Sequence, residues 1–223
     1  VDKITSNIPD LIKNIKYTQN KFIWMKAALG IMTTDTQPKM AMEECYIGNT
    51  LVKIYGIAKG SGMIHPNMAT MLSFVATDIK ISKAQLNSIH KKLVDSSYNM
   101  ITVDGDTSTN DSSILISSRK SQLNYEKLNS EDKNVFYSSI ESLYIELAKY
   151  IIRDGEGATK FVSINVDKIK NKKQGKSIGM SVANSLLVKT ALFAEDPNWG
   201  RILSAIGNSD SSIKDLSNIE IYL

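Results

Sequence analysis

Several features are scarce in this 223-residue sequence, and each scarcity excludes a class of protein. The one cysteine, Cys45, cannot form an internal disulfide, which excludes a disulfide-stapled secreted scaffold. The 27 basic residues outnumber the 23 acidic ones by only four, too few to predict a nucleic-acid partner. No apolar run approaches the roughly 20 residues of a membrane-spanning helix. We therefore expect a soluble, cytoplasmic protein that binds neither nucleic acid nor a membrane.

Histidine is also rare. His65 and His90 are the only two, too few for a histidine-rich metal site. By contrast, 42% of the residues are hydrophobic and 22% are charged, a composition that can bury a substantial core. The chain is therefore expected to form one large domain or two small ones.

Hydrophobic periodicity and turn signals divide the chain into helices and strands. Helices are expected between 9 and 31, with Pro9 in a first turn, and over 82–97, 130–153, 180–193 and 199–207. Strands are expected in a hairpin over 42–58 that turns at Gly48-Asn49, and over 71–77, 112–118, 160–167 and 218–223. The polar segment 33–38 is predicted as a loop, and the lysine-rich segment 168–176 as a solvated hairpin tip. Hairpins and helices in this order favour a layered α+β fold.

Three segments are unusually rich in small and polar residues: 59–70, 104–111 and 154–160. The first lacks both common phosphate-loop patterns, so nucleotide binding is not indicated. It does place a small residue, Ala69, before Thr70 at the start of a strand. Such a threonine can attack the preceding peptide bond and become a new N-terminus, whose amine is the base for its own hydroxyl. A buried strand threonine without this chemistry is the simpler alternative.

The other two segments also have competing interpretations. Asp104, Asp106 and Asp111 are oxygen donors, but the segment departs from the calcium-loop template, and a turn that satisfies its own backbone is the alternative. Glu156, between two glycines, is either a solvated loop acid or a carboxylate that binds an amine. A Cys45–His65 hydrolase pair is conceivable, although a cysteine in an apolar strand is more often inert.

Taken together, these segments resemble the ornithine acetyltransferase family, the glutamate N-acetyltransferases of arginine biosynthesis. The matching motifs are collinear: Met32-Thr33-Thr34-Asp35-Thr36 with Pro38-Lys39, the Lys59–Leu72 segment, Thr102–Asp111, Asp154–Lys160, Leu187–Ala191 and Asp196–Ile202.

The resemblance implies a layered αββα sandwich and a single catalytic region over 1–223, cut by the protein itself between Ala69 and Thr70 into 1–69 and 70–223. It implies that Thr70 is the nucleophile, and that Thr33, Lys59 and Glu156 contact substrate or tune the nucleophile. A Lys59 ammonium near the new amine would lower the pKa of that amine, and Glu156 would hold the ammonium group of the substrate.

The implied reaction is a ping-pong transfer of acetyl from N2-acetylornithine to glutamate, with no metal or cofactor and with acetyl-CoA as a possible second donor. The family implies an assembly of two α and two β chains. Family members also carry an upstream Ser-Thr-Gly oxyanion segment and a C-terminal substrate-binding segment that this sequence does not include, so the isolated stretch is expected to be inactive. His65 and Ser61 are milder departures from the family pattern.

Two other functions remain open. One is an aminopeptidase or amidase with an N-terminal nucleophile, which would pass the acyl group to water. The other is a binding module without catalytic activity. Transfer of label to N-acetylglutamate, rather than release of acetate, separates the first from a transferase, and the state of the 69–70 bond bears on the second.

Overall fold

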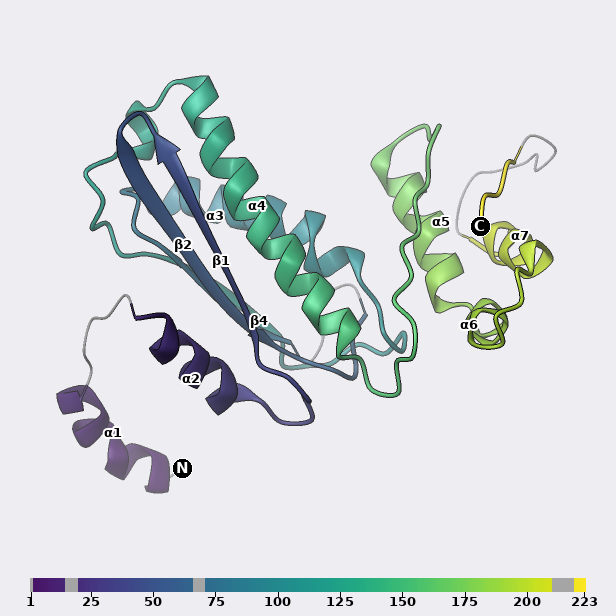
Figure 1. Ribbon diagram of the computed structural model, residues 1–223, viewed down its shortest axis with the longest axis horizontal. Helices are drawn as coiled ribbons and strands as arrows, with labels where there is room; N and C mark the ends of the chain where they lie inside the picture. Colours follow the sequence, from purple (N-terminus) through teal and green to yellow (C-terminus); the bar gives the residue numbers. More distant parts are fainter. Residues whose placement is uncertain (1, 15–19, 66–70, 210–218) are drawn as a thin grey trace.

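The computed structural model describes residues 2–14, 20–65, 71–209 and 219–223. These residues form a four-stranded sheet and a set of helices (Figure 1). The strands are β1 (Lys39–Ile47), β2 (Thr50–Lys59), β3 (Leu72–Thr77) and β4 (Ser112–Ser117). The α-helices are α1 (Asp2–Asn14), α2 (Lys21–Ile31), α3 (Lys83–Ser96), α4 (Ser130–Arg153), α5 (Lys172–Asn184), α6 (Leu186–Phe193) and α7 (Trp199–Gly207), and short 3₁₀ turns occupy Tyr98–Met100 and Tyr125–Lys127. Within the described ranges, none of the helices has the length and apolar composition that crossing a membrane demands.

The strands lie in the order β1-β2-β3-β4. β1 and β2 form an antiparallel hairpin in which Ile47 pairs with Thr50, and Gly48 turns the chain with a φ of 56°. β2 and β3 are also antiparallel, and Lys59 pairs with Leu72. β3 and β4 are parallel, so the chain between them must cross over, and α3 makes that crossover.

Side chains alternate between the two faces of the sheet, and the two faces meet different helices. Gly56 of β2 faces α4, since a Cβ placed on it would lie 2.8 Å from Leu143 and 2.9 Å from Leu147. The next residue back, Tyr55, faces α2, where its ring meets that of Trp24 at 5.8 Å. Helix α4 therefore covers β1 and β2 on one face, while α2 lies against the other (Figure 1).

A Gly56→Ala substitution is expected to lower the free energy of unfolding by about 1–3 kcal/mol, because the new methyl overpacks the contact between β2 and α4. Urea denaturation measures this change. Gly30→Ala in α2 is the matched control, since a Cβ there meets nothing within 4 Å and helix propensity favours alanine. Equal stability of the Gly56 and Gly30 variants would contradict the packing described.

The predicted α+β class is confirmed by helices that pack on a mixed sheet. Of the two stacked sheets in an αββα sandwich, the described residues contain one. The hairpin, the helices over 82–97, 130–153 and 199–207 and the strands over 71–77 and 112–118 are confirmed to within a few residues. Local capping fixes two of these helices, because Ser82 and Asn129 accept hydrogen bonds from the first-turn amides of Gln85 and Asp132.

Four predictions are wrong. Segment 160–167 is not a strand, since its alternating side chains have no neighbouring strand within the described ranges to pair with. The lysine-rich segment is not a hairpin tip, because Asn171 caps the start of α5 and its side chain accepts from Gln174 N. Pro9 lies inside α1 rather than in a first turn. Residues 219–223 are not a strand either, and residue 218 lies outside the described residues.

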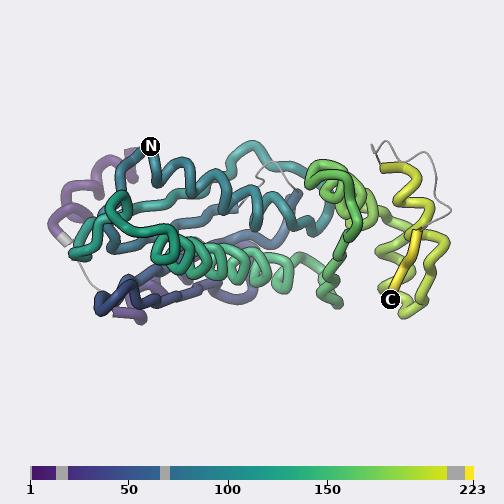
Figure 2. The backbone as a smooth tube through the Cα atoms, turned by 90° about the horizontal axis from the view of Figure 1, so that it is seen from above, coloured from purple at the N-terminus to yellow at the C-terminus, as the bar shows by residue number. Residues whose placement is uncertain are grey.

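The C-terminal helices have their own hydrophobic cluster, separate from the one beneath the sheet. Its buried members are Ile178, Val182, Val188, Ala205 and Ile206. Figure 2 shows α5, α6 and α7 together at one end of the molecule, beyond the sheet and α4.

Candidate functional site

Three of the predicted site residues lie in the described part of the chain, at the same end of the sheet. Lys59 is the last residue of β2, Thr33 lies in the loop after α2, and Glu156 follows the end of α4. Ala69 and Thr70, the predicted cleavage site and nucleophile, lie outside the described residues. Their roles therefore stay predictions.

Lys59 and Thr33 are in direct contact. The Lys59 ammonium donates a hydrogen bond of 3.0 Å to the Thr33 hydroxyl oxygen. Lys59 is only 9% exposed, whereas Thr33 is exposed, so the hydroxyl lies at the surface with the cation behind it. A hydroxyl beside an ammonium is a polar pair that can bind a carbonyl or carboxylate oxygen.

Glu156 contacts the glycine-rich loop that follows Lys59. Its backbone N–H donates to the carbonyl of Ser61 at 2.8 Å. A Cβ added to Gly62 would lie 2.9 Å from the Glu156 carboxylate, so the missing side chain at position 62 makes room for that carboxylate. Glu156 is exposed, and it forms no ion pair within 4 Å among the described residues. An accessible carboxylate, that of Glu156, therefore lies beside the glycine-rich loop.

Two buried charged residues, Asp35 and Lys39, and the half-buried Asp154 form a group beside these contacts. The Lys39 ammonium, only 2% exposed, lies 2.5 Å from a carboxylate oxygen of Asp35 and 2.5 Å from one of Asp154. Asp35 also accepts from the backbone N–H groups of Gly60 at 2.7 Å and Thr33 at 3.2 Å. Asp154 accepts from both the backbone N–H and the hydroxyl of Thr36. We call Asp35, Lys39 and Asp154 the charged triad.

The hydrogen bonds of the triad keep both carboxylates ionised. Burial alone would raise the pKa of Asp35, but the bonds from the Gly60 N–H and the Lys39 ammonium outweigh it and hold that pKa below its usual value. Burial likewise opposes ionisation of Asp154, and its bonds from Lys39 and Thr36 lower the pKa. Both carboxylates of the triad are therefore ionised at neutral pH, and the Lys39 side chain lies between them.

The sequence interpretation did not single out the triad. Asp35, Lys39 and Asp154 are all within quoted motifs, but nothing in a local pattern indicates that Lys39 is buried, since lysine is rarely fully buried.

In the segment 104–111, the aspartate side chains accept hydrogen bonds from backbone N–H groups. Asp104 accepts from the N–H groups of Met63 at 2.6 Å and Ile64 at 3.1 Å, and this holds Met63 at a φ of 51°. Asp111 accepts from the N–H of Met71 at 2.6 Å. The described ranges contain no group of three or more histidine, cysteine, aspartate or glutamate residues placed to hold a metal ion. The turn interpretation is thus favoured, and its carboxylates fix the two described ends of the segment that contains the predicted cleavage site.

Cys45 and His65 lie in different environments and have different contacts. Cys45 is buried in the core beneath the sheet, and burial raises the pKa of its thiol, which makes it a poor nucleophile. His65 instead lies 3.2 Å from the Asn184 amide nitrogen, and Asn184 accepts a bond from Thr102 at 2.8 Å. These contacts give no support to a Cys45–His65 hydrolase.

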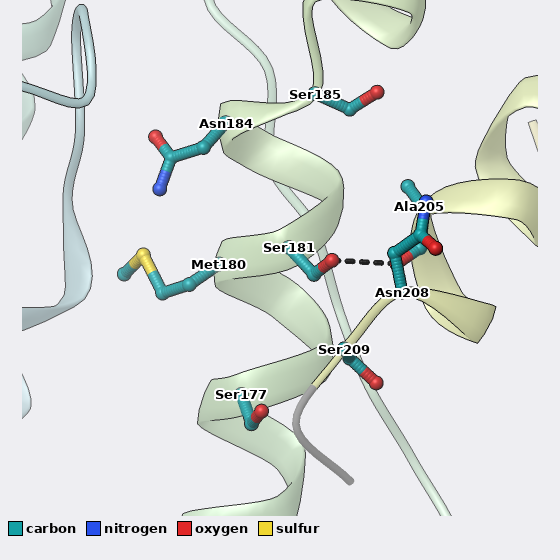
Figure 3. Close-up of a pocket in the computed structure, with 8 residues that line it drawn as sticks. All are labelled: Ser177, Met180, Ser181, Asn184, Ser185, Ala205, Asn208 and Ser209. Atoms are coloured by element: carbon teal, nitrogen blue, oxygen red, sulfur yellow. Dashed lines mark hydrogen bonds between the residues drawn. The ribbon is translucent and has the colours of Figure 1, made fainter.

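Asn184 also lines a shallow pocket of about 450 Å³ between α5 and α7 (Figure 3). Apart from Met180, the other lining residues are small or polar, and Ser181 bridges the two helices by donating to the Ala205 carbonyl at 2.5 Å. A second cavity of about 590 Å³ borders the charged triad through Lys39 and Asp154. Neither set of lining residues includes Thr33, Lys59 or Glu156.

Comparisons with known proteins agree with the motifs. A family model described as the ArgJ family matches residues 1–223. The arginine biosynthesis bifunctional protein ArgJ of Methylococcus capsulatus is 45% identical over 223 residues, which cover 100% of this chain and 54% of that protein. The protein of the same name from Neisseria meningitidis serogroup A is 46% identical over 224 residues, covering 100% and 53%.

A solved structure is similar as well. The crystal structure of arginine biosynthesis bifunctional protein argJ from Bacillus halodurans superposes with a TM-score of 0.59 at 40% identity, over 64% of this chain and 67% of that one. The chain spans about half the length of the curated relatives it matches.

Proposed function

The chain belongs to the ArgJ family, and on that premise we propose that the complete protein containing it moves an acetyl group from N2-acetylornithine to glutamate in arginine biosynthesis. The observation that carries the proposal is the contact between the Lys59 ammonium and the Thr33 hydroxyl, beside the loop that accommodates Glu156. Three predicted substrate contacts from distant parts of the chain thus converge on one end of the sheet.

In the proposed reaction, cleavage between Ala69 and Thr70 exposes the amine of Thr70. That amine, with a reference pKa of about 7.7–8.0, takes the proton of the Thr70 hydroxyl as its oxygen attacks the acetyl carbonyl. The C–N bond to ornithine breaks, and the proton passes to the departing amine. The neutral amine of glutamate then attacks the resulting ester and gives a proton to the Thr70 amine. The ester C–O bond breaks, the Thr70 amine returns that proton to the Thr70 oxygen, and N-acetylglutamate leaves.

The strand register supports roles for Lys59 and Glu156 in this scheme. Thr70 stands two residues before Leu72 in the sequence, and Leu72 is paired with Lys59. A nearby ammonium lowers the pKa of an amine and so keeps it neutral and basic at physiological pH. Glu156 supplies the opposite charge, which suits the side-chain ammonium group of acetylornithine.

A Glu156→Gln substitution is expected to raise the KM for acetylornithine by about 10- to 100-fold, because the negative charge that faces the side-chain ammonium of that substrate is lost. Steady-state kinetics of the complete protein measure the change. Glu195→Gln is the control, since Glu195 belongs to an exposed ion pair with Lys160. An unchanged KM in the Glu156 variant would remove Glu156 from the substrate site.

Acetylornithine mixed with labelled glutamate and the complete protein tests the reaction itself. Label in N-acetylglutamate supports transfer, whereas acetate as the sole product would indicate an aminopeptidase or amidase. Acetyl-CoA in place of acetylornithine tests the second donor. We further propose that no metal or cofactor takes part, that the cut pieces assemble as two α and two β chains, and that the protein acts in the cytoplasm.

A further inference from the structure

The charged triad has one connection to each segment that carries a predicted substrate contact. Asp35 belongs to the loop of Thr33, and its carboxylate holds the N–H of Thr33. The same carboxylate holds the N–H of Gly60, the residue after Lys59. Asp154 stands two residues before Glu156, at the end of α4. The three segments are distant in sequence. The Lys39 ammonium joins the Asp35 carboxylate, which binds the first two segments, to the carboxylate of Asp154, which belongs to the third.

Stability alone does not explain such a group. Removing three charges from water costs several kcal/mol for each ion, and well-packed apolar residues of similar volume often give equal or greater stability. Apolar side chains, however, could not bind the N–H groups of Thr33 and Gly60 or hold the end of α4 against the loop of Thr36. The charged side chains therefore fix the position of the backbone at Thr33, at Gly60 and at the end of α4.

Because positional errors of about 1 Å can cost catalysis heavily, a buried polar frame beneath a site has a direct effect on activity. A second contact strengthens the frame, since the hydroxyls of Thr34 and Ser61 are 2.7 Å apart and tie the same two loops. Ser61 in turn accepts the N–H of Glu156 at 2.8 Å.

We infer that Asp35, Lys39 and Asp154 are positioning residues that set the relative placement of Thr33, Lys59 and Glu156, an inference that rests on the proposed function for its substrates. Asp154 does not touch Gly60: one connection between them runs through Lys39 and Asp35, and a second runs through the bond from the Glu156 N–H to the carbonyl of Ser61, the residue after Gly60.

Hydrogen exchange tests this connection without reference to activity. In the complete protein, Asp154→Asn is expected to speed amide exchange at Gly60 by about tenfold, as well as at Thr36, because the Lys39–Asp35 side of the triad loosens. Glu146→Gln is the matched control: Glu146 also lies on α4, and its carboxylate forms an exposed ion pair of 3.9 Å with Arg153. Exchange at Gly60 that stays at the wild-type rate in the folded Asp154 variant would overturn the inference.

Kinetics supply the second readout. At a temperature where thermal unfolding shows the variant fully folded, Asp154→Asn is expected to raise the KM for both substrates by about tenfold or more, and Asp154→Glu to recover part of the loss. A variant with faster exchange but wild-type kcat and KM would also overturn the positioning role, because the triad would then contribute only stability. Should Asp154→Asn fail to fold, Asp35→Asn provides the kinetic comparison, with amide exchange measured at Thr33 and Gly60, whose N–H groups the Asp35 carboxylate accepts.

The two readouts separate the inference from the proposed function. Wild-type protein that transfers no acetyl group would refute the proposed function, while the exchange rate at Gly60 would still decide whether the triad connects the three segments.

Discussion

A Thr70→Ala substitution in the complete protein is expected to leave the polypeptide uncut and to reduce acetyl transfer by a factor on the order of 10⁴ or more. The methyl group of alanine can neither attack the bond after Ala69 nor carry an acetyl ester, so both proposed steps lose their nucleophile. Intact-mass analysis measures the cut, and labelled glutamate measures the transfer. Cleavage and acetyl transfer both depend on the Thr70 hydroxyl oxygen, so the substitution should abolish both together.

Two companion variants make this result specific. Thr70→Ser keeps a hydroxyl at the same position and is expected to retain cleavage. Thr50→Ala removes a threonine at the opposite end of β2 from Lys59 and is expected to behave as wild type. Cleavage of the Thr70→Ala protein at the 69–70 bond would eliminate the proposed self-processing, and transfer by the uncut variant would eliminate the acetyl ester.

Lys39→Met is expected to lower the free energy of unfolding by about 3–5 kcal/mol, the largest loss of stability among the substitutions considered. Methionine matches the length of the lysine side chain, but it leaves the carboxylates of Asp35 and Asp154 buried without a cation between them. Urea denaturation of the complete protein measures the loss, provided that the transition is two-state.

We expect the loss of stability in Lys39→Met to come from the missing charge rather than from a change in side-chain volume. Two controls separate these causes. Lys13→Met removes a lysine whose ion pair with Asp10 is fully at the surface, and it should change stability by less than about 0.5 kcal/mol. Lys39→Met combined with Asp35→Asn and Asp154→Asn neutralises the whole triad and should regain part of the lost stability. A loss below about 1 kcal/mol for Lys39→Met alone would contradict a buried, paired ammonium.

Local patterns predicted the elements that carry their own signals. Helix α4 was recognisable because its apolar stripe repeats at the helical period, and Phe136, Ile140 and Leu143 are indeed fully buried. The β1–β2 hairpin was recognisable because Gly48 permits the left-handed turn that its strands need. In both cases a few neighbouring residues decide the structure, so no distant contact had to be known.

Elements that depend on distant partners were not predictable in this way. Val162 and Ile164 alternate as in a strand, but alternation does not supply the neighbouring backbone that a strand requires, and both side chains are largely exposed. The lysine-rich segment is exposed over 168–173, as its charge suggests, but it is a helix start rather than a hairpin tip because the side chain of Asn171 caps α5 within it.

The residues of the candidate site also fall into those that the sequence indicates and those that only the folded chain reveals. Thr33, Lys59 and Glu156 were identified through motifs of a known family, and the structure brings their segments to one end of the sheet. The triad beneath them was not identified, because its bonds span 115 positions between Lys39 and Asp154 and no local pattern reports such a contact. Burial of a lysine is a property of the folded chain and has no signature in the sequence around it.

The placement of β2 has a consequence for a chain cut between residues 69 and 70. β1 and β2 would belong to the first piece, whereas β3, β4 and α4 would belong to the second. The seam between the pieces would run through the middle of the sheet, where β2 hydrogen-bonds to β3, and through the packing of α4 on β1 and β2. Neither piece could keep a closed hydrophobic interior by itself, so dilution would not separate them, and the two would unfold as a single cooperative unit.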